Sequence, residues 1–542
     1  MIKLSLRERG CALLLLLMFA FFGPGFQSIP LSGACFLLYY VGLVYCSERW
    51  YDFALIIIVH SVGFWLDYLY LFGRDGASVL FMSIFPIVFS TLMAITFIPP
   101  FKLLTKRYPR LSLESGGVYI LPIAFTGVFS MITTWAPSGS WGNFGYFSVM
   151  DFAAFMQVTT LFGLDGVNFL LSWTVSHLFC WMTRRKRIQG TEAKKRTQRQ
   201  LKRYIAVVFV VFFYSGARQL NSYGRFFQES IQDWEQDKIN AVCLTGYDTE
   251  GVLRSRLNKT ASVASQGLFI NKADLSFDTP DLILWSEGSV SVANQAEKDV
   301  LFDGMKDIAI ENNVMIGFGY MEVLEHPANG YTQKNMFSLI LPNGTVGISY
   351  QKVHPVIKIE DSTEPGTDAV KPVDAGPRYG TINAAICFDY DFPDYMRKVA
   401  RGASLILQPG EDWGPIGVLH ARMGAMRALE NGVTLFRCSS GGVSGVYDAY
   451  GNVLVETVLG SVEGETNAFT AQIPVTGAVW TLYTYLGGAL GYCCVALSML
   501  MLLLCLVPEN TVRNIDLLYL FLYRPDIEMD EDPLLMQQTF DI

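Results

Sequence analysis

The chain has 542 residues, of which 51% are hydrophobic and only 17% are charged, and its formal net charge is −8. Soluble proteins carry about a quarter charged residues, so this composition excludes a protein that is soluble along its whole length. The apolar excess lies in residues 1–220 and 480–507, whereas residues 230–478 have the composition of one large globular domain. The basic residues cluster in one short loop without interleaved aromatic side chains, so we expect no nucleic-acid partner.

Seven apolar segments precede the globular region, and each is close to the ~20 residues that cross a membrane. They lie at residues 11–29, 31–46, 54–73, 78–99, 117–135, 152–182 and 204–220, and an eighth lies at 481–507. The first segment resembles a signal peptide, but no small-residue cleavage site follows it and further spans come at once. We therefore expect it to be a retained helix.

The placement of lysine and arginine predicts the orientation of these helices. Basic residues occupy the N-terminus, the loop after the fourth segment and the loop at 184–203, whereas the loop at 136–150 has none. All basic loops face the cytoplasm only if the N-terminus is cytoplasmic and seven helices precede the globular domain. We therefore predict a seven-helix transmembrane domain at 1–225, an extracytoplasmic domain at 226–478, a C-terminal transmembrane helix at 479–508 and a cytoplasmic tail at 509–542.

The globular region alternates between strand-like and helix-like stretches, which is typical of an α/β fold with sheets buried beneath helices. Helices are predicted at 290–311 and 416–431. Strands are predicted at 281–286, 313–322, 336–341, 346–351, 381–387, 403–408, 433–438 and 443–447.

Only three of the ten cysteines lie in this region, namely Cys243, Cys387 and Cys438. Three cysteines cannot all pair, so one is expected to be a free thiol in an oxidising compartment. The sequence leaves open whether Cys243 and Cys438 form a disulfide.

Three predicted strands end in a reactive side chain. The stretch TINAAICFDYDFP at 381–393 delivers Cys387 at a strand end before a sharp turn, DLILWSE ends in Glu287, and VGISYQK ends in Lys352. A carboxylate can take a proton, an ammonium can stabilise an oxyanion, and a thiol can form a covalent acyl-enzyme. A lone cysteine in an apolar strand is more often inert core; the joint occurrence of all three at strand ends favours catalysis.

These residues and their order resemble the carbon–nitrogen hydrolase (nitrilase) superfamily. With seven spans before the domain and one after it, nearly the whole chain resembles the apolipoprotein N-acyltransferases. The resemblance implies a polytopic α-helical membrane domain plus an α/β nitrilase-like (αββα sandwich) extracytoplasmic domain. It assigns Glu287 as the general base, Lys352 as the oxyanion-holding lysine and Cys387 as the nucleophile.

The same resemblance implies a surrounding pocket. Glu360 matches the second glutamate of the family, and Trp413 matches a family tryptophan. Phe388 stands where tyrosine is usual in the family. Asp389 stands where glutamate is usual, and its side chain is one methylene shorter. These departures leave the triad intact, and no cofactor and no metal are expected.

The resemblance implies an acyltransferase that moves a fatty acyl chain from a membrane phospholipid, through a Cys387 thioester, to the N-terminal amine of a lipoprotein or another amine. Its partners would be the phospholipid donor, the amine acceptor and the membrane. One alternative is a membrane-anchored amidase that uses the same triad on a small amide. A second is a non-catalytic binding protein, which the intact triad disfavours. The aromatic and glycine-rich loop at 138–147 would either gate lipid access or form an interfacial belt.

Overall fold

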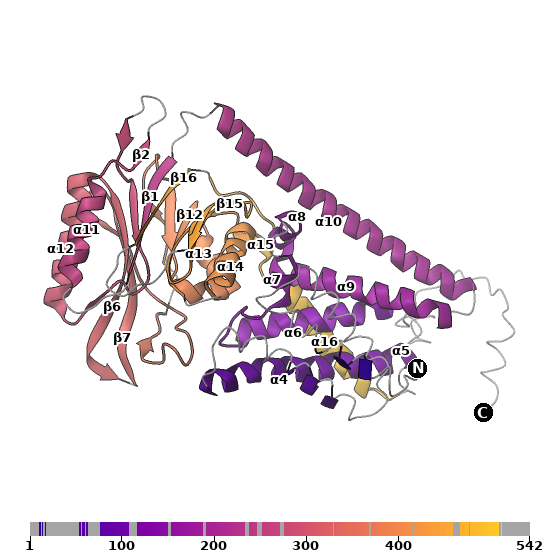
Figure 1. Cartoon of the computed structure of the whole chain (residues 1–542). Coiled ribbons are helices and arrows are strands. Elements are labelled where there is room, and N and C mark those ends of the chain that lie inside the picture. The colour runs from indigo at the N-terminus through magenta and orange to yellow at the C-terminus, as the bar shows by residue number, and fades with distance from the viewer. Residues whose placement is uncertain are drawn as a thin grey trace, which may run out of the picture.

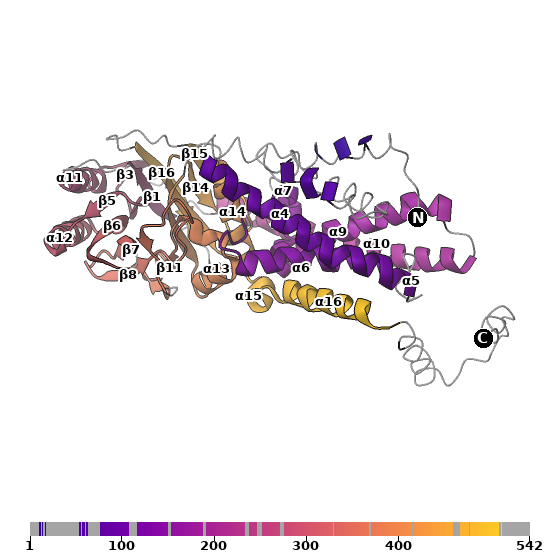
Figure 2. The ribbon, with the colours of Figure 1, turned by 90° about the horizontal axis from the view of Figure 1, so that it is seen from below.

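The computed structural model of the chain has two parts, a bundle of helices and a globular domain with two sheets, which lie at opposite ends of an elongated molecule (Figures 1 and 2). The structure describes residues 76–107, 116–149, 153–187, 191–232, 238–246, 252–270, 276–328, 330–367, 370–412, 416–458, 467–475 and 477–508, with Thr511 and isolated positions within 10–17 and 54–62. The spans expected at 11–29, 31–46 and 54–73 fall largely outside these residues, as does most of the expected tail.

The helical part contains long apolar helices joined by short ones. In chain order it comprises α4 (Gly76–Pro99), a π-helical turn (Pro100–Leu104), α5 (Thr105–Arg107), a 3₁₀ turn (Gly116–Tyr119), α6 (Ile120–Trp135), α7 (Phe144–Val149), α8 (Ala153–Met156), α9 (Thr159–Arg187), α10 (Thr191–Gln232), α15 (Tyr483–Leu486) and α16 (Ala489–Leu506). Within the described ranges, four helical segments are long and apolar enough to cross a membrane: Ile87–Arg107, Gly116–Trp135, Lys194–Gly224 and Ala489–Leu506.

Helix α9 covers the sixth expected span but is not one of these four segments. Its first turn is broken at Phe162 and Gly163, and Gly163 has a φ of +60°. A Cβ on Gly163 would lie 2.6 Å from the ring of Tyr483. Glycine is therefore required at this kink for two reasons. The backbone angle disfavours a residue with a side chain, and the close approach of α15 leaves no space for one.

The globular domain contains two large sheets and a small one. The described residues form an eight-stranded sheet of β1 (Lys238–Thr245), β4 (Leu282–Trp285), β5 (Val290–Val292), β6 (Met315–Ala328), β7 (Tyr331–Ile340), β8 (Val346–Gln351), β9 (Thr363–Glu364) and β16 (Asn467–Pro474). The second sheet has the order β10 (Val373–Asp374), β11 (Thr381–Ala384), β12 (Leu405–Glu411), β13 (Thr434–Ser440), β14 (Val443–Tyr447) and β15 (Val453–Val458). Strands β2 (Phe269–Ile270) and β3 (Phe277–Asp278) pair separately.

The two large sheets pack face to face, and helices cover their outer faces. Alternation along β1 directs Cys243 into the core between the sheets and Val242 towards α11 (Val252–Ala264) and α12 (Gln295–Asn312). On the other sheet, α13 (Pro393–Ala400) and α14 (Ile416–Asn431) lie on the side of the membrane helices (Figure 2). The result is an αββα sandwich, as expected.

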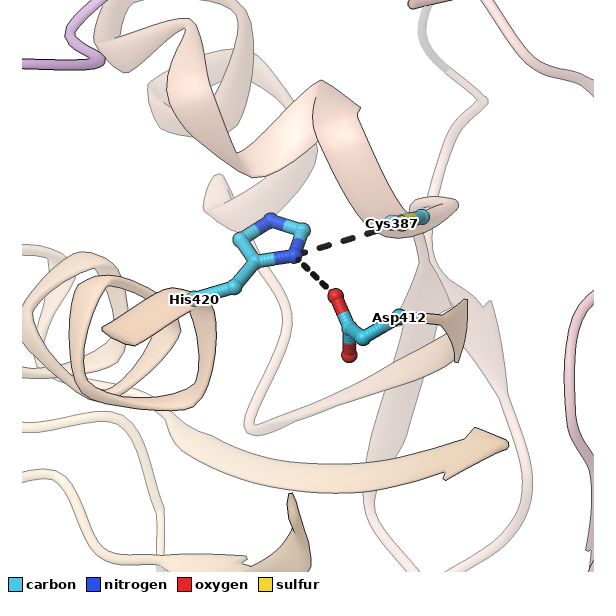
Figure 3. A group of neighbouring side chains, drawn as sticks. All are labelled: Cys387, Asp412 and His420. Carbon is cyan, nitrogen blue, oxygen red and sulfur yellow. Dashed lines mark hydrogen bonds and ion pairs between the residues drawn. The ribbon is translucent and has the colours of Figure 1, made fainter. Parts of the chain in front are cut away.

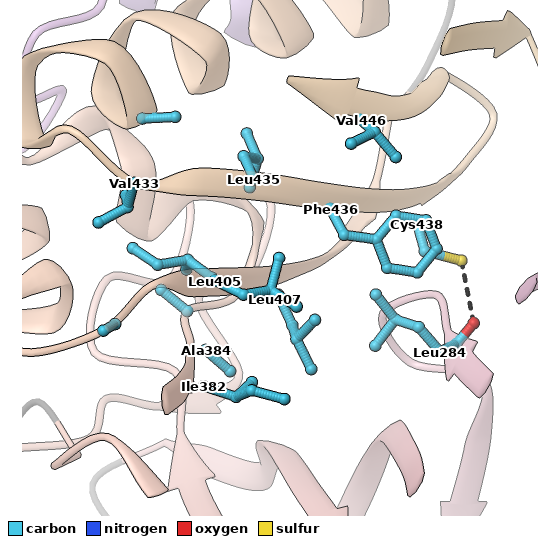
Figure 4. Packing of buried hydrophobic residues seen from close by; sticks show 14 of the residues in the cluster. Leu284, Ile382, Ala384, Leu405, Leu407, Val433, Leu435, Phe436, Cys438 and Val446 are labelled. Carbon is cyan, nitrogen blue, oxygen red and sulfur yellow. Dashed lines mark hydrogen bonds between the residues drawn. The ribbon is translucent and has the colours of Figure 1, made fainter. Parts of the chain in front are cut away.

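A disulfide joins the two sheets through this core. Cys243 of β1 and Cys438 of β13 are bonded, with Cα atoms 5.3 Å apart. Figure 4 shows Cys438 among the apolar side chains of β11 to β14, with its sulfur 3.2 Å from the carbonyl oxygen of Leu284 in β4. The pairing that the sequence left open is therefore present, and Cys387 is the thiol left free in this domain.

The two parts of the molecule meet along α14. Its apolar face packs against α7, α8 and α9 in a cluster that contains Tyr146, Met156, Leu164, Val167, Leu419, Met423, Met426 and Leu429. At the same contact, Arg427 of α14 donates to the hydroxyl of Tyr146 over 2.6 Å. Helix α14 is therefore buried on both sides, between the second sheet and the helical part.

Several predicted elements have the observed bounds, and others are displaced. The strands at 346–351 and 443–447 and the helix at 416–431 are confirmed as predicted. The helix predicted at 290–311 begins five residues later, at Gln295, because Val290–Val292 pairs in parallel with β6. The strand predicted at 381–387 stops at Ala384, and Cys387 instead begins a 3₁₀ turn.

Candidate active site

Three strand ends converge on one buried site. Glu287 follows β4, Lys352 follows β8, and Cys387 opens the 3₁₀ turn (Cys387–Asp391) that follows β11. The sequence predicts this set from strands of two different sheets, and the sandwich brings them together. Their exposed fractions are 5%, 1% and 5%, so bulk water is largely excluded from the three reactive groups.

Lys352 lies between two carboxylates. Its Nζ donates to Oε1 of Glu287 and to Oε2 of Glu360, each over 2.7 Å. Burial alone lowers the pKa of Lys352, but the two carboxylates outweigh this effect and hold the pKa well above its usual range. Lys352 is therefore a fixed ammonium, and Glu360 lies where the resemblance expects a second pocket glutamate.

Glu287 is held by donors on both of its oxygens. Besides Lys352, Nδ2 of Asn335 donates to Oε1 over 2.7 Å, and the backbone N–H of Glu411 donates to Oε2 over 3.1 Å. Burial raises the pKa of Glu287, and Lys352 opposes the rise. The Cys387 side chain acts to lower the pKa of Glu287, and Cys387 Sγ lies 3.5 Å from the carbonyl oxygen of Glu411, whose N–H donates to Glu287. The carboxylate and the thiol are therefore neighbours, as a proton transfer between them requires.

Cys387 has an unusual backbone conformation. Its φ is +43°, a left-handed value that few residues other than glycine adopt. This angle turns the chain sharply between β11 and the 3₁₀ turn, and strain of this kind is concentrated at functional sites. Burial raises the pKa of the Cys387 thiol well above its usual range, and the Glu287 carboxylate adds to the rise. The thiol is therefore protonated at rest and needs a base.

Asp389 holds the turn rather than lining the site. Its Oδ2 accepts from the backbone N–H of Ile386 over 3.2 Å and from the hydroxyl of Tyr350. Its Oδ1 accepts from the backbone N–H of His354 over 2.9 Å, and Nδ1 of His354 lies 2.8 Å away. The fully buried carboxylate of Asp389 thus connects the 3₁₀ turn at Cys387–Asp391, called the nucleophile turn below, to the segment after Lys352.

Phe388 and Trp413 are the remaining predicted pocket residues, and the structure describes only Phe388. Phe388 is half-buried, and its ring meets the ring of Phe392 edge-on at 5.5 Å. Trp413 lies outside the described residues, so its predicted place in the pocket stays a prediction.

Sequence reasoning gave no role at this site to two sets of polar residues, although His420 lies in a stretch that resembles a motif of the family. Asn335 lies in the middle of β7 in an otherwise ordinary strand sequence, and only the strand register brings it to Glu287. His420 and Asp412 also approach Cys387 (Figure 3). Their ligand atoms and that of Cys387 lie within 4.8 Å of one another. Zinc takes such donors, but here Asp412 is already paired with Arg437.

A cavity of about 180 Å³ lies between the segment that follows the Cys387–Asp391 turn and the helical part of the molecule. Its lining includes Ser130, Asp165 and Tyr492 from α6, α9 and α16, together with His354, Phe392 and Asp394 from the globular domain. Polar and aromatic groups from both parts of the molecule therefore enclose a space next to the residues that follow Cys387.

The loop between α6 and α7 is docked onto the globular domain. The backbone N–H of Ser140 donates to the carbonyl oxygen of Asp391 over 2.6 Å, and the ring of Trp141 meets the ring of His420 edge-on at 6.3 Å. Ser140 is fully buried. The aromatic and glycine-rich segment at 138–147 therefore forms a contact between the two parts of the molecule, which neither of the two expected roles described.

Most of the globular domain matches a known protein family. Residues 275–475 match the carbon–nitrogen hydrolase family, and this region contains Glu287, Lys352 and Cys387. Residues 275–475 are therefore similar to the carbon–nitrogen hydrolases, and they contain most of the αββα sandwich described above.

The relatives of the chain are more specific. It is similar to apolipoprotein N-acyltransferases of Shewanella oneidensis (36% identical over 107 residues, 18% of this chain and 20% of that protein) and Pseudomonas aeruginosa (26% over 196 residues, 32% and 37%). It also resembles that of Rhizobium leguminosarum (22% over 343 residues, 58% and 60%). The matches thus span 20–60% of the length of these relatives. By these similarities, the chain is related to the apolipoprotein N-acyltransferases.

A solved structure of an amidase from Nesterenkonia sp. also matches. It is 20% identical, covers 44% of this chain and 91% of the amidase, and has a TM-score of 0.35.

Proposed function

We propose that this chain is a membrane-embedded N-acyltransferase that moves a fatty acyl chain from a phospholipid, through a thioester on Cys387, to the amine of a lipoprotein. The observation that carries the proposal is the buried constellation of Glu287, Lys352 and Cys387. A cavity lined by His354 and Phe392, which follow Lys352 and Cys387 in the chain, and by residues of the apolar helices supports it. The relatedness to apolipoprotein N-acyltransferases supports the choice of donor and acceptor.

The first half-reaction would acylate the enzyme. Glu287 takes the thiol proton, and the Cys387 sulfur attacks the carbonyl carbon of a phospholipid ester. The carbon–sulfur bond forms as the carbon–oxygen bond breaks, and the proton on Glu287 passes to the departing lysophospholipid oxygen. The raised pKa of Glu287 suits both proton steps, because the group accepts a proton readily and can return it.

The negative charge that develops on the substrate oxygen would meet two donors. The Lys352 ammonium is fixed by its two carboxylate partners, and the backbone N–H of Phe388 follows the nucleophile directly. Preorganised donors of this kind contribute several kcal/mol to transition-state stabilisation in a dry site, about 3–4 kcal/mol for one donor.

The second half-reaction would release the acyl chain to the acceptor. The acceptor amine attacks the thioester carbon, its proton goes to Glu287, and the sulfur leaves as a thiolate that regains the proton. Glu360 and Trp413 are proposed to shape the pocket for these substrates. A thioester that persists until an amine arrives distinguishes this reaction from that of an amidase, in which water takes the acyl group.

The disulfide supports an extracytoplasmic catalytic domain. Structural disulfides persist in oxidising compartments and are rare in the cytosol, and Cys243–Cys438 crosses the core of this domain. Together with the basic loops, it favours a multi-pass protein whose globular domain at 226–478 lies outside the cytoplasm. We keep the predicted membrane domain at 1–225, helix at 479–508 and cytoplasmic tail at 509–542 as part of the proposal.

The test is to trap the acyl-enzyme. The full chain in detergent micelles is incubated with a phospholipid labelled in its sn-1 acyl chain, and hydroxylamine-labile label on the protein is measured. We expect label on the wild type and on Cys493→Ala, a matched control at an exposed cysteine, and none on Cys387→Ala. Absence of label from a folded wild-type protein would refute the acyltransferase and favour an amidase with a small-amide substrate.

A further inference from the structure

A second polar group lies near the Cys387 sulfur. Nδ1 of His420, in α14, is 4.0 Å from Sγ of Cys387 and 2.9 Å from Oδ1 of Asp412, which follows β12 (Figure 3). His420 and Asp412 are each 3% exposed. A buried imidazole this close to a nucleophilic sulfur is not explained by the Glu287, Lys352 and Cys387 constellation.

The hydrogen bonds around Asp412 define which nitrogen of His420 holds a proton. Asp412 is ionised: burial acts to raise its pKa, but the Arg437 guanidinium and the donors His420 and Ser439 outweigh burial and hold the pKa far below its usual range. An ionised carboxylate can only accept, so the 2.9 Å contact requires a hydrogen on Nδ1 of His420. That N–H donates to Asp412, and it places a partial positive charge close to the sulfur, which lies 4.0 Å from Nδ1.

The other nitrogen of His420 faces a different carboxylate. Nε2 lies 3.4 Å from Oδ2 of Asp391, the last residue of the nucleophile turn. The charged groups around His420 are thus Asp391 from the turn, Asp412 after β12, Arg437 from β13 and Arg427 from α14 itself, with Glu287 and Lys352 beyond the sulfur. The edge of the Trp141 ring closes the remaining side.

We propose that His420, oriented by Asp412, is a positioning residue that stabilises the thiolate form of Cys387 through its Nδ1–H. This inference rests on the proposed role of Cys387 as the nucleophile, and it adds a second group to the thiol chemistry. Asp412 holds the imidazole in the required tautomer, and Arg437 with Ser439 holds Asp412.

The proton and the charge balance at each step. When Glu287 takes the thiol proton, negative charge moves onto the sulfur, and the partial positive charge of the nearby Nδ1–H of His420 stabilises it. When the acceptor amine later displaces the sulfur from the thioester, the electron pair of the carbon–sulfur bond returns to the sulfur. The same N–H stabilises the thiolate in both events, and His420 itself gains and loses no proton.

The experiment measures the thiol directly, without any acyl substrate. The full chain in micelles is alkylated with iodoacetamide between pH 6 and 10, and modification of the Cys387 peptide is followed by mass spectrometry. We compare wild type with His420→Phe, which removes the donor, and with His420→Asn, which keeps an N–H near the place of Nδ1. Met423→Leu, one turn along α14 and fully buried, is the packing control.

We expect His420→Phe to slow alkylation about tenfold at each pH between 6 and 10. His420→Asn restores most of the rate, and Met423→Leu leaves the profile unchanged. An unchanged profile in folded His420→Phe overturns the proposal, as does an equal slowing in Met423→Leu. If His420→Phe does not fold, His420→Leu takes its place, and an unchanged profile in that variant overturns the proposal.

These outcomes are separable from those of the acyl-enzyme test. If no thioester forms but the alkylation profile depends on His420, the acyltransferase is refuted while the role of His420 stands. If a thioester forms and the profile does not depend on His420, only the role of His420 is refuted.

Discussion

Nζ of Lys352 and Oε1 of Glu287 lie 2.7 Å apart at a place where both side chains are almost wholly buried. The pair brings a permanent positive charge next to the proposed base. Because the ammonium lowers the pKa of Glu287 against the effect of burial, it sets the pH above which Glu287 can take the thiol proton. Lys352 therefore has two effects, one on the base and one on the substrate oxygen.

Replacing Lys352 by methionine should raise the pKa of Glu287 further and remove one oxyanion donor. We expect acylation of Cys387 to fall about 10²–10³-fold, with the acid limb of the pH–rate profile displaced to higher pH. Single-turnover labelling with a phospholipid between pH 5 and 9 measures both effects, and Lys298→Met, at a partly exposed ion pair, is the control. An acid limb at the wild-type position would contradict this role of Lys352.

Asn335 should affect the acylation rate through its hydrogen bond to Glu287, although its side chain takes part in no chemical step. Substitution by alanine removes a 2.7 Å donor from Oε1 of Glu287 and leaves that oxygen with Lys352, at a cost of about 1–3 kcal/mol for a bond to a charged group. We expect roughly a tenfold loss in the acylation rate without loss of fold. The neighbouring Met336→Leu should retain the wild-type rate, and equal losses in the two variants would show that β7 packing, not the hydrogen bond, is responsible.

Gly139 should be required for docking of the α6–α7 loop. It has a φ of +56°, and a Cβ there would lie 2.4 Å from the carbonyl oxygen of Asp391. We expect Gly139→Ala to lower the melting temperature and the acylation rate together. Gly330→Ala is the control for backbone strain alone. Gly330 has a φ of +86°, but a Cβ there would meet no atom within 4 Å. Equal destabilisation by the two variants would mean that contact with Asp391 is unimportant.

Asp391 should make folding stability depend on pH. Burial raises its pKa to about 6 from an ordinary value of 3.8, so the folded protein binds this proton more tightly than the unfolded chain. The stability that the protonated carboxyl contributes is therefore present below about pH 4 and lost as pH rises through 6. We expect Asp391→Asn to gain roughly 2–3 kcal/mol relative to wild type on going from pH 4 to pH 8. Melting curves that shift in parallel over this range would rule this out.

The disulfide should contribute substantially to the stability of the globular domain. It joins residues 195 positions apart, and removal of a native disulfide costs about 2–5 kcal/mol. We expect the double variant Cys243→Ala and Cys438→Ala to melt well below wild type and to be insensitive to dithiothreitol, whereas wild type loses stability in reductant. Cys505→Ala should behave as wild type. Identical melting of reduced and oxidised wild type would argue against a stabilising bond.

The residues that the sequence could predict are those whose role shows locally. Cys387, Glu287 and Lys352 each end an apolar run, and strand ends of a sandwich meet at an edge, so their convergence follows from the pattern. Asn335 and His420 show no such signal. Asn335 reaches Glu287 through the register of β6 and β7, and His420 reaches Cys387 because α14 lies over the second sheet.

The fold was predictable to a similar degree. The sandwich follows from alternating strands and helices, but α13 was missed because PDYMRKVA is eight residues long, too short for a clear helical period. Helix α11 begins near residues outside the described ranges, and its apolar positions, such as Leu253 and Leu257, are few. The end of β11 before Cys387 depends on the positive φ of that residue, which no sequence pattern specifies for cysteine.

The bond between Arg427 and Tyr146 crosses the predicted domain boundary at residue 226. Arg427 is 1% exposed and is paired with Glu430 on its own helix. A fragment cut at that boundary would deprive Arg427 of the Tyr146 hydroxyl that accepts its hydrogen bond, and it would expose the apolar face of α14 to water. The two parts should therefore unfold in a single cooperative transition, and amide exchange in α14 should respond to substitutions made in the membrane helices.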